Sequence, residues 1–195
     1  CFLYAFYVFT QLGARCELIA VGNKVGFTRS NLEEEMPRLD VIPFESEFQY
    51  MATSHETSSL ASDKKQRTIY VKGSVEAILK RCQQMLDVKG NLASVDVETI
   101  HQQVDAMANL GLRVLAFAKK TVPDVETCYG TSLQRADIEN DLIFLGLQGM
   151  IDPPRTEAIK AVQACQEAGI QVKMITGDHA VTAQAIARSM LTSCT

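Results

Sequence analysis

Two consecutive prolines, Pro153 and Pro154, constrain the fold of this 195-residue chain more than any other feature. Each proline fixes its own backbone angle, lacks an amide hydrogen and restricts the residue before it, so neither a helix nor a central strand can run through them. The segment from Asp152 to Arg155 is therefore predicted to be a stiff, extended joint. We expect a domain boundary there, with a different fold on each side.

Upstream of the joint, several segments have strand patterns. Residues 47–54 alternate with a period of two, and the β-branched and aromatic residues 68–72 are the expected partner strand. The polar, serine-rich residues 56–66 between them are predicted to form a surface loop. Residues 112–118 and 142–150 are predicted to be further strands. These strands are expected to be antiparallel with helices on one face, which is an α+β fold.

Two helices are predicted among these strands. Ser74 is the expected N-cap of the first, since its hydroxyl can accept a hydrogen bond from the first helical turn. The apolar stripe of this helix is expected to comprise Val75, Ile78, Leu79, Cys82, Met85 and Leu86. The second helix is expected over residues 94–110, with Gly111 at its end.

Downstream of the joint, the order of elements is typical of a parallel α/β sheet. An amphipathic helix is expected over residues 156–168, closed by Gly169 and followed by a strand at 170–175 and a helix that begins near His179. The residues expected to face inward from the first of these helices are Ala158, Ile159, Ala161, Val162 and Cys165.

The turn Thr176-Gly177-Asp178 joins this strand to the last helix. A helix N-terminus presents free backbone N–H groups, Gly177 lets a ligand approach, and Thr176 adds a hydroxyl, so the turn can bind phosphate. Capping of the helix by Asp178, with Gly177 serving the turn, is the alternative. The turn alone slightly favours capping, and the phosphate interpretation depends on the segments upstream.

Composition excludes some classes of function. The formal net charge is −4 and the basic residues are scattered, which indicates no nucleic-acid partner. The six cysteines form no CxxC pair, so neither a zinc site nor a disulfide framework is indicated, and a reducing compartment is expected. The apolar residues 1–14 are too short to span a bilayer. They are a buried strand, a buried helix or a terminus outside the native fold.

Five separated segments together carry a resemblance. They read PFESEFQYM at 43–51, VKGSVE at 71–76, GLRVLA at 111–116, DPPR at 152–155 and MITGD at 174–178. In this order and spacing they resemble the cytoplasmic nucleotide-binding domain and the first part of the phosphorylation domain of P-type cation-transporting ATPases. The first segment is most similar to the calcium-type pumps of the second class.

The resemblance implies a domain organisation. An atypical apolar segment at 1–25 precedes an α+β nucleotide-binding domain at 26–151, an antiparallel sheet with flanking helices. A hinge at 152–155 leads to an incomplete phosphorylation domain at 156–195, a partial haloacid-dehalogenase-like (Rossmann-like) segment.

The resemblance also implies roles for residues of the nucleotide-binding domain. Phe44 matches the aromatic residue that stacks on adenine, and Met51 matches a residue near that pocket. Lys72 matches a lysine that attracts the triphosphate, Gly73 lets the backbone approach the nucleotide, and Arg113 matches an arginine that reaches the phosphates. Without the resemblance, Phe44 would be an ordinary core residue and Lys72 a solvated residue at a strand end. Gly73 would simply form a turn, and Arg113 would be a surface residue.

Beyond the nucleotide-binding domain, the resemblance assigns further contacts. Asp152 and Arg155 lie in the hinge, where the two domains of the family close on bound ATP. Thr176 and Gly177 match groups that bind the phosphoryl group, and Asp178 is expected to help place the nucleotide. ATP and Mg²⁺ are the implied cofactors.

The chain also departs from the family. Gln49 stands where the family often has a lysine, and Glu17 is a poor match for a glutamate that contacts adenine. The Asp-Lys-Thr-Gly-Thr and Gly-Asp-Gly-x-Asn-Asp segments, which carry the phosphorylated aspartate and the Mg²⁺ ligands, do not occur in this sequence. We therefore expect no catalytic residue and no metal ligand in this chain.

The resulting expectation is an ATP-binding fragment of a cation pump, soluble by itself and on the cytoplasmic side of a membrane-embedded parent. Its partners would be ATP and the phosphorylation, actuator and transmembrane domains of that parent. The alternatives are a stand-alone, non-catalytic nucleotide-binding module and a fragment of a dehalogenase-like phosphatase. The phosphatase is disfavoured because its Asp-x-Asp nucleophile pair is missing.

Overall fold

The computed structural model describes residues 29–59, 62–87, 89–122, 132–150, 155–176 and 180–192. The chain divides into two compact units. The first contains residues 1–95 and 115–148, and the second contains residues 96–114 and 149–195. The expectations for residues 1–25, for Asp152 and for Gly177 and Asp178 fall outside the described residues.

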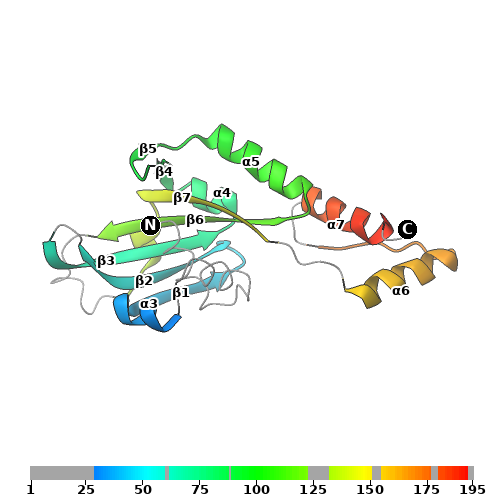
Figure 1. Ribbon diagram of the computed structural model, residues 1–195, viewed down its shortest axis with the longest axis horizontal. Helices are drawn as coiled ribbons and strands as arrows, with labels where there is room; N and C mark the ends of the chain where they lie inside the picture. Colours follow the sequence, from blue (N-terminus) through cyan, green and yellow to red (C-terminus); the bar gives the residue numbers. More distant parts are fainter. Residues whose placement is uncertain are drawn as a thin grey trace. The chain divides into compact units, whose positions relative to one another are not determined.

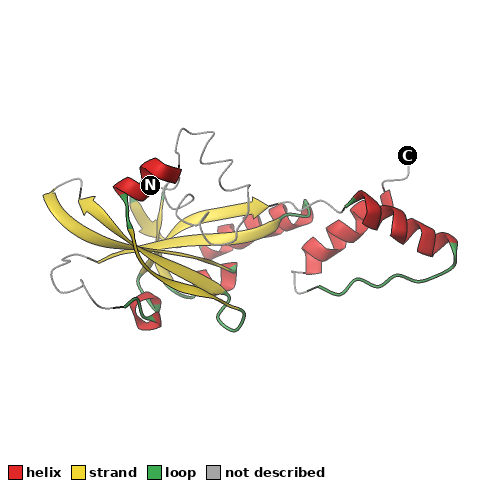
Figure 2. Cartoon of the chain, turned by 90° about the horizontal axis from the view of Figure 1, so that it is seen from below, coloured by secondary structure: helices red, strands yellow, loops and turns green. Residues whose placement is uncertain are grey.

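The first unit is built on a seven-stranded sheet with strand order β1-β2-β3-β6-β7-β4-β5 (Figures 1 and 2). The β1–β2, β2–β3, β3–β6 and β4–β5 pairs are antiparallel, and the β4–β7 pair is parallel. The expected antiparallel sheet is thus a mixed sheet. The strands are β1 (Arg38–Glu45), β2 (Tyr50–Ser59), β3 (Ser62–Gly73), β4 (Cys82–Leu86), β5 (Leu92–Ser94), β6 (Arg113–Val122) and β7 (Leu142–Met150).

The hairpin of β2 and β3 is longer than the sequence pattern indicates. The predicted loop at 56–66 is wrong, because Glu56 pairs with Arg67 and Thr57 pairs with Gln66 in the continuing ladder. The hydroxyls of Thr57 and Thr68 share a hydrogen bond of 2.9 Å across the two strands. Polar composition favoured a loop, but threonine is β-branched and pairs well on a sheet surface.

Helix α4 (Val75–Leu79) confirms the predicted cap and corrects the predicted length. The Ser74 Oγ accepts a hydrogen bond of 3.2 Å from the amide of Ala77. The helix stops after five residues, and the second half of the expected apolar stripe forms β4 instead. Strand β4 pairs with β7, and this tertiary pairing overrides a local pattern that suits a helix or a strand equally well.

The core of the first unit lies on both sides of the sheet. Its largest fully buried apolar side chains come from β3, α4, β6, the 3₁₀ helix η2 (Arg135–Ile138) and β7. They are Ile69, Val71, Ile78, Phe117, Ile138 and Leu142. The remaining described helix of this unit is α3 (Arg29–Glu35).

The second unit contains the helices α5 (Val97–Asn109), α6 (Thr156–Glu167) and α7 (Ala180–Thr192). Their positions confirm three predicted helices, although the helix at 94–110 was expected among the strands of the nucleotide-binding domain. Asp96 rather than a residue at 94 caps α5, since its carboxylate accepts a 3.0 Å hydrogen bond from the Thr99 amide. Gly111 and Gly169 follow α5 and α6 with φ of 76° and 75°, as expected of helix-ending glycines. In the described ranges, no helix combines the length and apolar content needed to cross a membrane.

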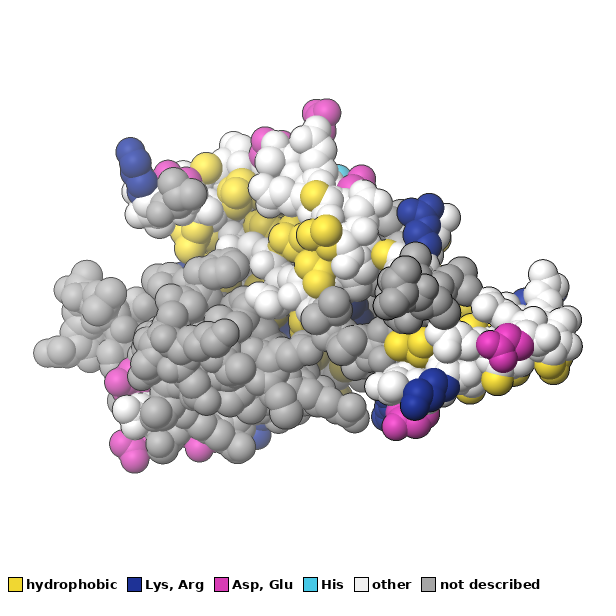
Figure 3. All heavy atoms as spheres, turned by 45° about the vertical axis from the view of Figure 1, so that its right-hand side comes forward, with side chains coloured by type: hydrophobic (Ala, Val, Ile, Leu, Met, Phe, Trp, Pro, Cys, Tyr) yellow, Lys and Arg dark blue, Asp and Glu magenta, His cyan; other side chains and the backbone are white. Residues whose placement is uncertain are grey.

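The predicted strand at 170–175 is wrong, because this segment has no regular secondary structure. A strand needs a neighbour for its backbone groups, and none of the described residues pairs with this segment. Ile170 and Ile175 are 57% and 97% exposed. The inward face expected for α6 is only half-buried, and Ala161 is exposed. Figure 3 shows such hydrophobic side chains reaching the surface.

Candidate functional site

A row of three buried side chains crosses β2, β3 and β6. Met51 lies directly opposite Lys72, and Lys72 lies directly opposite Phe117. Directly opposite residues project from the same face of a sheet, with Cβ atoms roughly 5 Å apart. Their exposed fractions are 2% for Met51, 6% for Lys72 and 1% for Phe117. The structure therefore brings two of the predicted site residues, Met51 and Lys72, into one row.

Phe44 lies on the neighbouring strand β1, at an irregularity in its pairing with β2. Ile42 pairs with Ala52 and Glu45 pairs with Tyr50, so β1 contains one residue more than β2 over this interval, and Phe44 lies inside it. Such a bulge changes the direction of the side chains around it. Phe44 is 58% exposed, so its ring is accessible to a flat ligand.

Lys72 is a cation in a largely dehydrated position. Burial lowers the pKa of its ammonium group from 10.5 to about 8. The charged form still predominates at neutral pH, but it is less stable there than in water. An anion that approached this group would favour the charged form and raise the pKa again.

Gly73 is required by the packing of the sheet. It pairs with Tyr50, and a Cβ at this position would lie 2.7 Å from the Tyr50 Cβ and closer still to the Gln49 carbonyl oxygen. No other residue fits without displacing the start of β2. The approach of a nucleotide to Gly73 stays a prediction.

Gln49 has a structural role at the position where the resemblance implies a lysine. It closes the turn after β1 with φ of 57°, and its amide donates a 2.9 Å hydrogen bond to the Glu45 carbonyl. Its side-chain Oε1 accepts a 3.1 Å hydrogen bond from the Ser74 hydroxyl. Gln49 thus ties the turn beside Phe44 to the cap that follows Lys72 and Gly73.

The other predicted residues belong to the second unit. Arg113 is exposed at the start of β6, and Arg155 is exposed immediately before α6, where its side chain makes no capping bond. Thr176 is exposed at the end of the irregular segment. The structure therefore groups Phe44, Met51, Lys72 and Gly73 on one sheet.

Two buried polar groups on the same face were not predicted from the sequence. Thr53 and His55 follow Met51 at intervals of two, so they share its face. Among the described residues, Thr53 Oγ1 and His55 Nε2 have no hydrogen-bond partner although both are buried, whereas His55 Nδ1 lies 3.1 Å from the Met36 carbonyl oxygen. Burial lowers the pKa of His55. The period of two extended beyond Met51 would have identified both residues.

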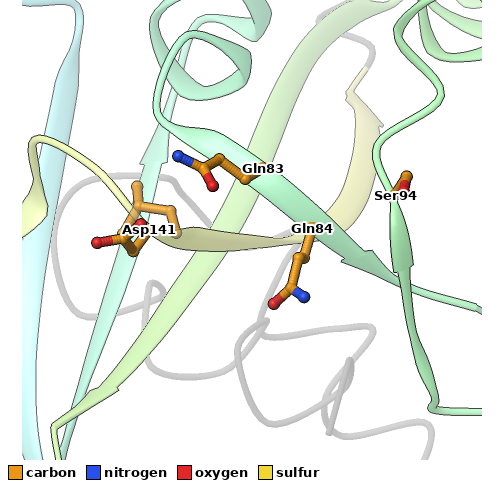
Figure 4. A pocket seen from close by; sticks show the side chains of 5 residues that line it. Gln83, Gln84, Ser94 and Asp141 are labelled. Carbon is orange, nitrogen blue, oxygen red and sulfur yellow. The ribbon is translucent and has the colours of Figure 1, made fainter.

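A cavity of about 290 Å³ lies elsewhere on the first unit, at β4, β5 and β7. It is lined by Gln83, Gln84, Ser94, Asp141 and Leu142 (Figure 4). Figure 4 shows the side chains of Gln83 and Gln84 leaving β4 in opposite directions, so the polar groups do not converge. None of the predicted site residues lines this cavity. Across the described ranges, no three His, Cys, Asp or Glu side chains cluster closely enough to hold a metal ion.

Comparison with known proteins identifies the family of the chain. Residues 13–157 match the family model of the P-type ATPase cytoplasmic domain N. The chain is 57% identical to the cation-transporting ATPase pma1 of Synechocystis sp. over 89% of its own length and 18% of that protein. It is 41% identical to calcium-transporting ATPase 1 of Lactococcus lactis over 89% of its length and 19% of that protein.

A eukaryotic relative extends the comparison. The chain is 43% identical to the sodium/potassium exporting P-type ATPase cta3 of Schizosaccharomyces pombe, over 76% of its own length and 13% of that protein. The chain thus spans less than a fifth of the length of each of these relatives. The family match and these relatives lead to one conclusion: this chain belongs to the P-type ATPase family and contains its cytoplasmic domain N.

Proposed function

We propose that this chain binds the adenosine end of ATP and, as part of a larger cation pump, holds Mg·ATP for phosphorylation of an aspartate outside its sequence. The observation that supports this most directly is the register of the sheet. Lys72, a buried cation, lies directly opposite Met51 on β2, and the accessible ring of Phe44 belongs to β1, the strand that pairs with β2.

Phe44 is proposed to bind the purine ring of ATP. A flat ring system stacks on an aromatic face with little need for polar partners, and such stacking contributes about 1–3 kcal/mol per base. The Phe44 ring is more than half exposed, so it has free area to offer. The neighbouring Met51 thioether supplies a polarisable apolar surface beside it.

Lys72 and Arg113 are proposed to bind the triphosphate of ATP. A polyanion near Lys72 would recover the hydration that burial of the ammonium removes, which favours binding of the charged form. The planar fork of Arg113 can hold two oxygens at once. Gly73 follows Lys72 directly at the end of β3, and its backbone is proposed to lie near the nucleotide.

Residues of the second unit are proposed to act on the phosphate end of the nucleotide. Thr176, Gly177 and Asp178 precede α7, where free backbone N–H groups of a helix N-terminus favour an anion. Asp152 and Arg155 are proposed to belong to a hinge that closes on ATP. Magnesium bound with the triphosphate would neutralise part of its charge, with its protein ligands lying outside this chain.

The parent protein is proposed to be a membrane-embedded pump with this part on the cytoplasmic side. Its phosphorylation, actuator and transmembrane domains would be the partners of this chain. The names of the relatives specify different cations, so the sequence of this chain does not assign the transported ion.

A fluorescent ATP analogue tests the proposal. Saturable binding to the purified chain, displaced by unlabelled ATP and weakened by Phe44→Ala, is the expected result. Equal binding by the wild type and by Phe44→Ala would contradict the assignment of the purine site.

A further inference from the structure

Arg135 makes two contacts with the segment that follows Phe44, although about 90 residues separate them in sequence. Its Nη2 lies 2.5 Å from Oε1 of Glu45, the residue directly after Phe44. Its guanidinium carbon lies 3.6 Å from the centroid of the Phe48 ring. A single side chain therefore holds the turn after β1 by an ion pair and by a cation–π contact.

A second attachment holds the other side of the bulge. The amide of Leu133, two residues before Arg135, donates a 2.6 Å hydrogen bond to Oδ2 of Asp40 in β1. The segment between these contacts is itself closed, because the Gln134 amide donates a 2.9 Å hydrogen bond to the Asp137 carboxylate. Residues 133–137, which we name the strap, are thus attached to β1 before and after the bulge.

The bulge is the feature that redirects Phe44. With an exposed fraction of 58%, the Phe44 ring has little packing of its own to hold it, so its direction depends on the backbone between Asp40 and Glu45. We propose that Arg135 is a positioning residue for purine recognition: by holding Glu45 and Phe48 it fixes the bulge that presents Phe44 to the base. This inference rests on the proposed nucleotide-binding function.

The chemistry of the contact requires an arginine. The planar guanidinium can pair with a carboxylate at its edge while its face lies on an aromatic ring, and an ammonium group cannot do both in this way. Arg135→Lys therefore keeps the charge and loses the planar contact with Phe48. The conservative variant consequently separates the effect of charge from that of geometry.

The experiment compares Arg135→Ala, Arg135→Lys and Lys120→Ala by titration with ATP and with inorganic tripolyphosphate. Lys120→Ala is the matched control, since it removes one positive charge from the first unit and breaks a 3.1 Å hydrogen bond to the Asn140 carbonyl, outside the strap. The same titrations on Phe44→Ala and on the Phe44→Ala/Arg135→Ala double variant complete a mutant cycle. Urea unfolding of each variant establishes that it is folded under the binding conditions.

The expected result is roughly fivefold weaker ATP binding for Arg135→Ala, a smaller loss for Arg135→Lys, and unchanged tripolyphosphate binding in both. In the Phe44→Ala background, Arg135→Ala should have no further effect on ATP binding. Lys120→Ala should bind ATP as the wild type does.

The outcomes separate this inference from the function on which it rests. If Phe44→Ala weakens ATP binding and folded Arg135→Ala does not, the positioning role is overturned while the proposed function stands. Equal weakening of ATP and tripolyphosphate binding by Arg135→Ala also overturns it, because Arg135 would then act through its charge. Should Arg135→Ala be unfolded, Arg135→Lys decides the matter by the same comparison. No effect of Phe44→Ala on ATP binding overturns the proposed function itself.

Discussion

Met51 and Lys72 lie directly opposite each other on β2 and β3, both almost fully buried. Burial removes part of the hydration of the Lys72 ammonium, and its pKa falls to about 8. The charged form is therefore less favourable here than in water, and the proposed binding of an anion would offset part of this cost.

Phe44→Ala is expected to weaken ATP binding by roughly 5- to 100-fold, because stacking of a base on an aromatic ring contributes about 1–3 kcal/mol. Its effect on the free energy of unfolding should stay below about 0.5 kcal/mol, since the ring is mostly exposed. Isothermal titration calorimetry and urea unfolding measure the two effects. Leu39→Ala is the matched control: it removes another exposed apolar side chain from β1 and should leave ATP binding unchanged.

Lys72→Met is expected to raise the free energy of unfolding by about 1 kcal/mol and to weaken ATP binding. Methionine fills the space of the lysine stem and removes the cost of burying the ammonium. A higher free energy of unfolding together with weaker ATP binding distinguishes this account from an ordinary loss of packing, which would lower the free energy of unfolding. If the variant were less stable than the wild type and bound ATP equally well, Lys72 would be a structural residue.

The pH dependence of stability follows from the same group. The folded-state pKa of Lys72, about 8, lies below the unfolded value of 10.5, so the unfolded chain binds more protons between these values. The contribution of Lys72 to stability therefore rises as the pH increases from about 8 to about 10.5. Urea unfolding at several pH values should show this rise in the wild type and its absence in Lys72→Met.

ATP affinity should change with pH in the opposite direction. Binding requires the charged form of Lys72, so affinity is expected to fall by about fivefold to tenfold between pH 7 and pH 9. Phe44→Ala should keep this dependence while binding more weakly at every pH. Retention of the full dependence in Lys72→Met would show that another group controls it.

Gly73→Ala is expected to destabilise the first unit by about 1–3 kcal/mol, because the added methyl group would overlap the backbone of β2. Gly90→Ala provides the comparison. Gly90 has φ of 85° and nothing within 4 Å of the added Cβ, so only the backbone conformation is strained and the loss should be about 1 kcal/mol. Thermal unfolding of the two variants measures the difference, and equal losses would contradict the packing argument.

The sequence predicted correctly those helix ends that carry a capping residue or a helix-ending glycine. Ser74 caps α4 as expected, and Gly111 and Gly169 end their helices with positive φ. These features depend on neighbours within a few residues, so the sequence contains the information for them. The family resemblance, which depends on ordered motifs, is likewise confirmed.

Elements that depend on pairing with strands far away in the sequence were predicted poorly. Residues 82–86 continue an apolar stripe that suits a helix, yet they form β4 because β7 lies beside them in parallel. Residues 170–175 have the composition of a strand but no paired neighbour among the described residues. The contact between Arg135 and Glu45 joins residues 90 positions apart, which no local pattern shows.

The central claim is that a purine nucleotide binds at Phe44, Met51 and Lys72. The most direct measurement is titration of the ¹⁵N-labelled chain with ATP, followed by the chemical shifts of its backbone amides. The account predicts that the largest changes occur at residues 43–51 and 71–74, with the same pattern reduced in Phe44→Ala. Saturable binding with no changes in these two segments would contradict it.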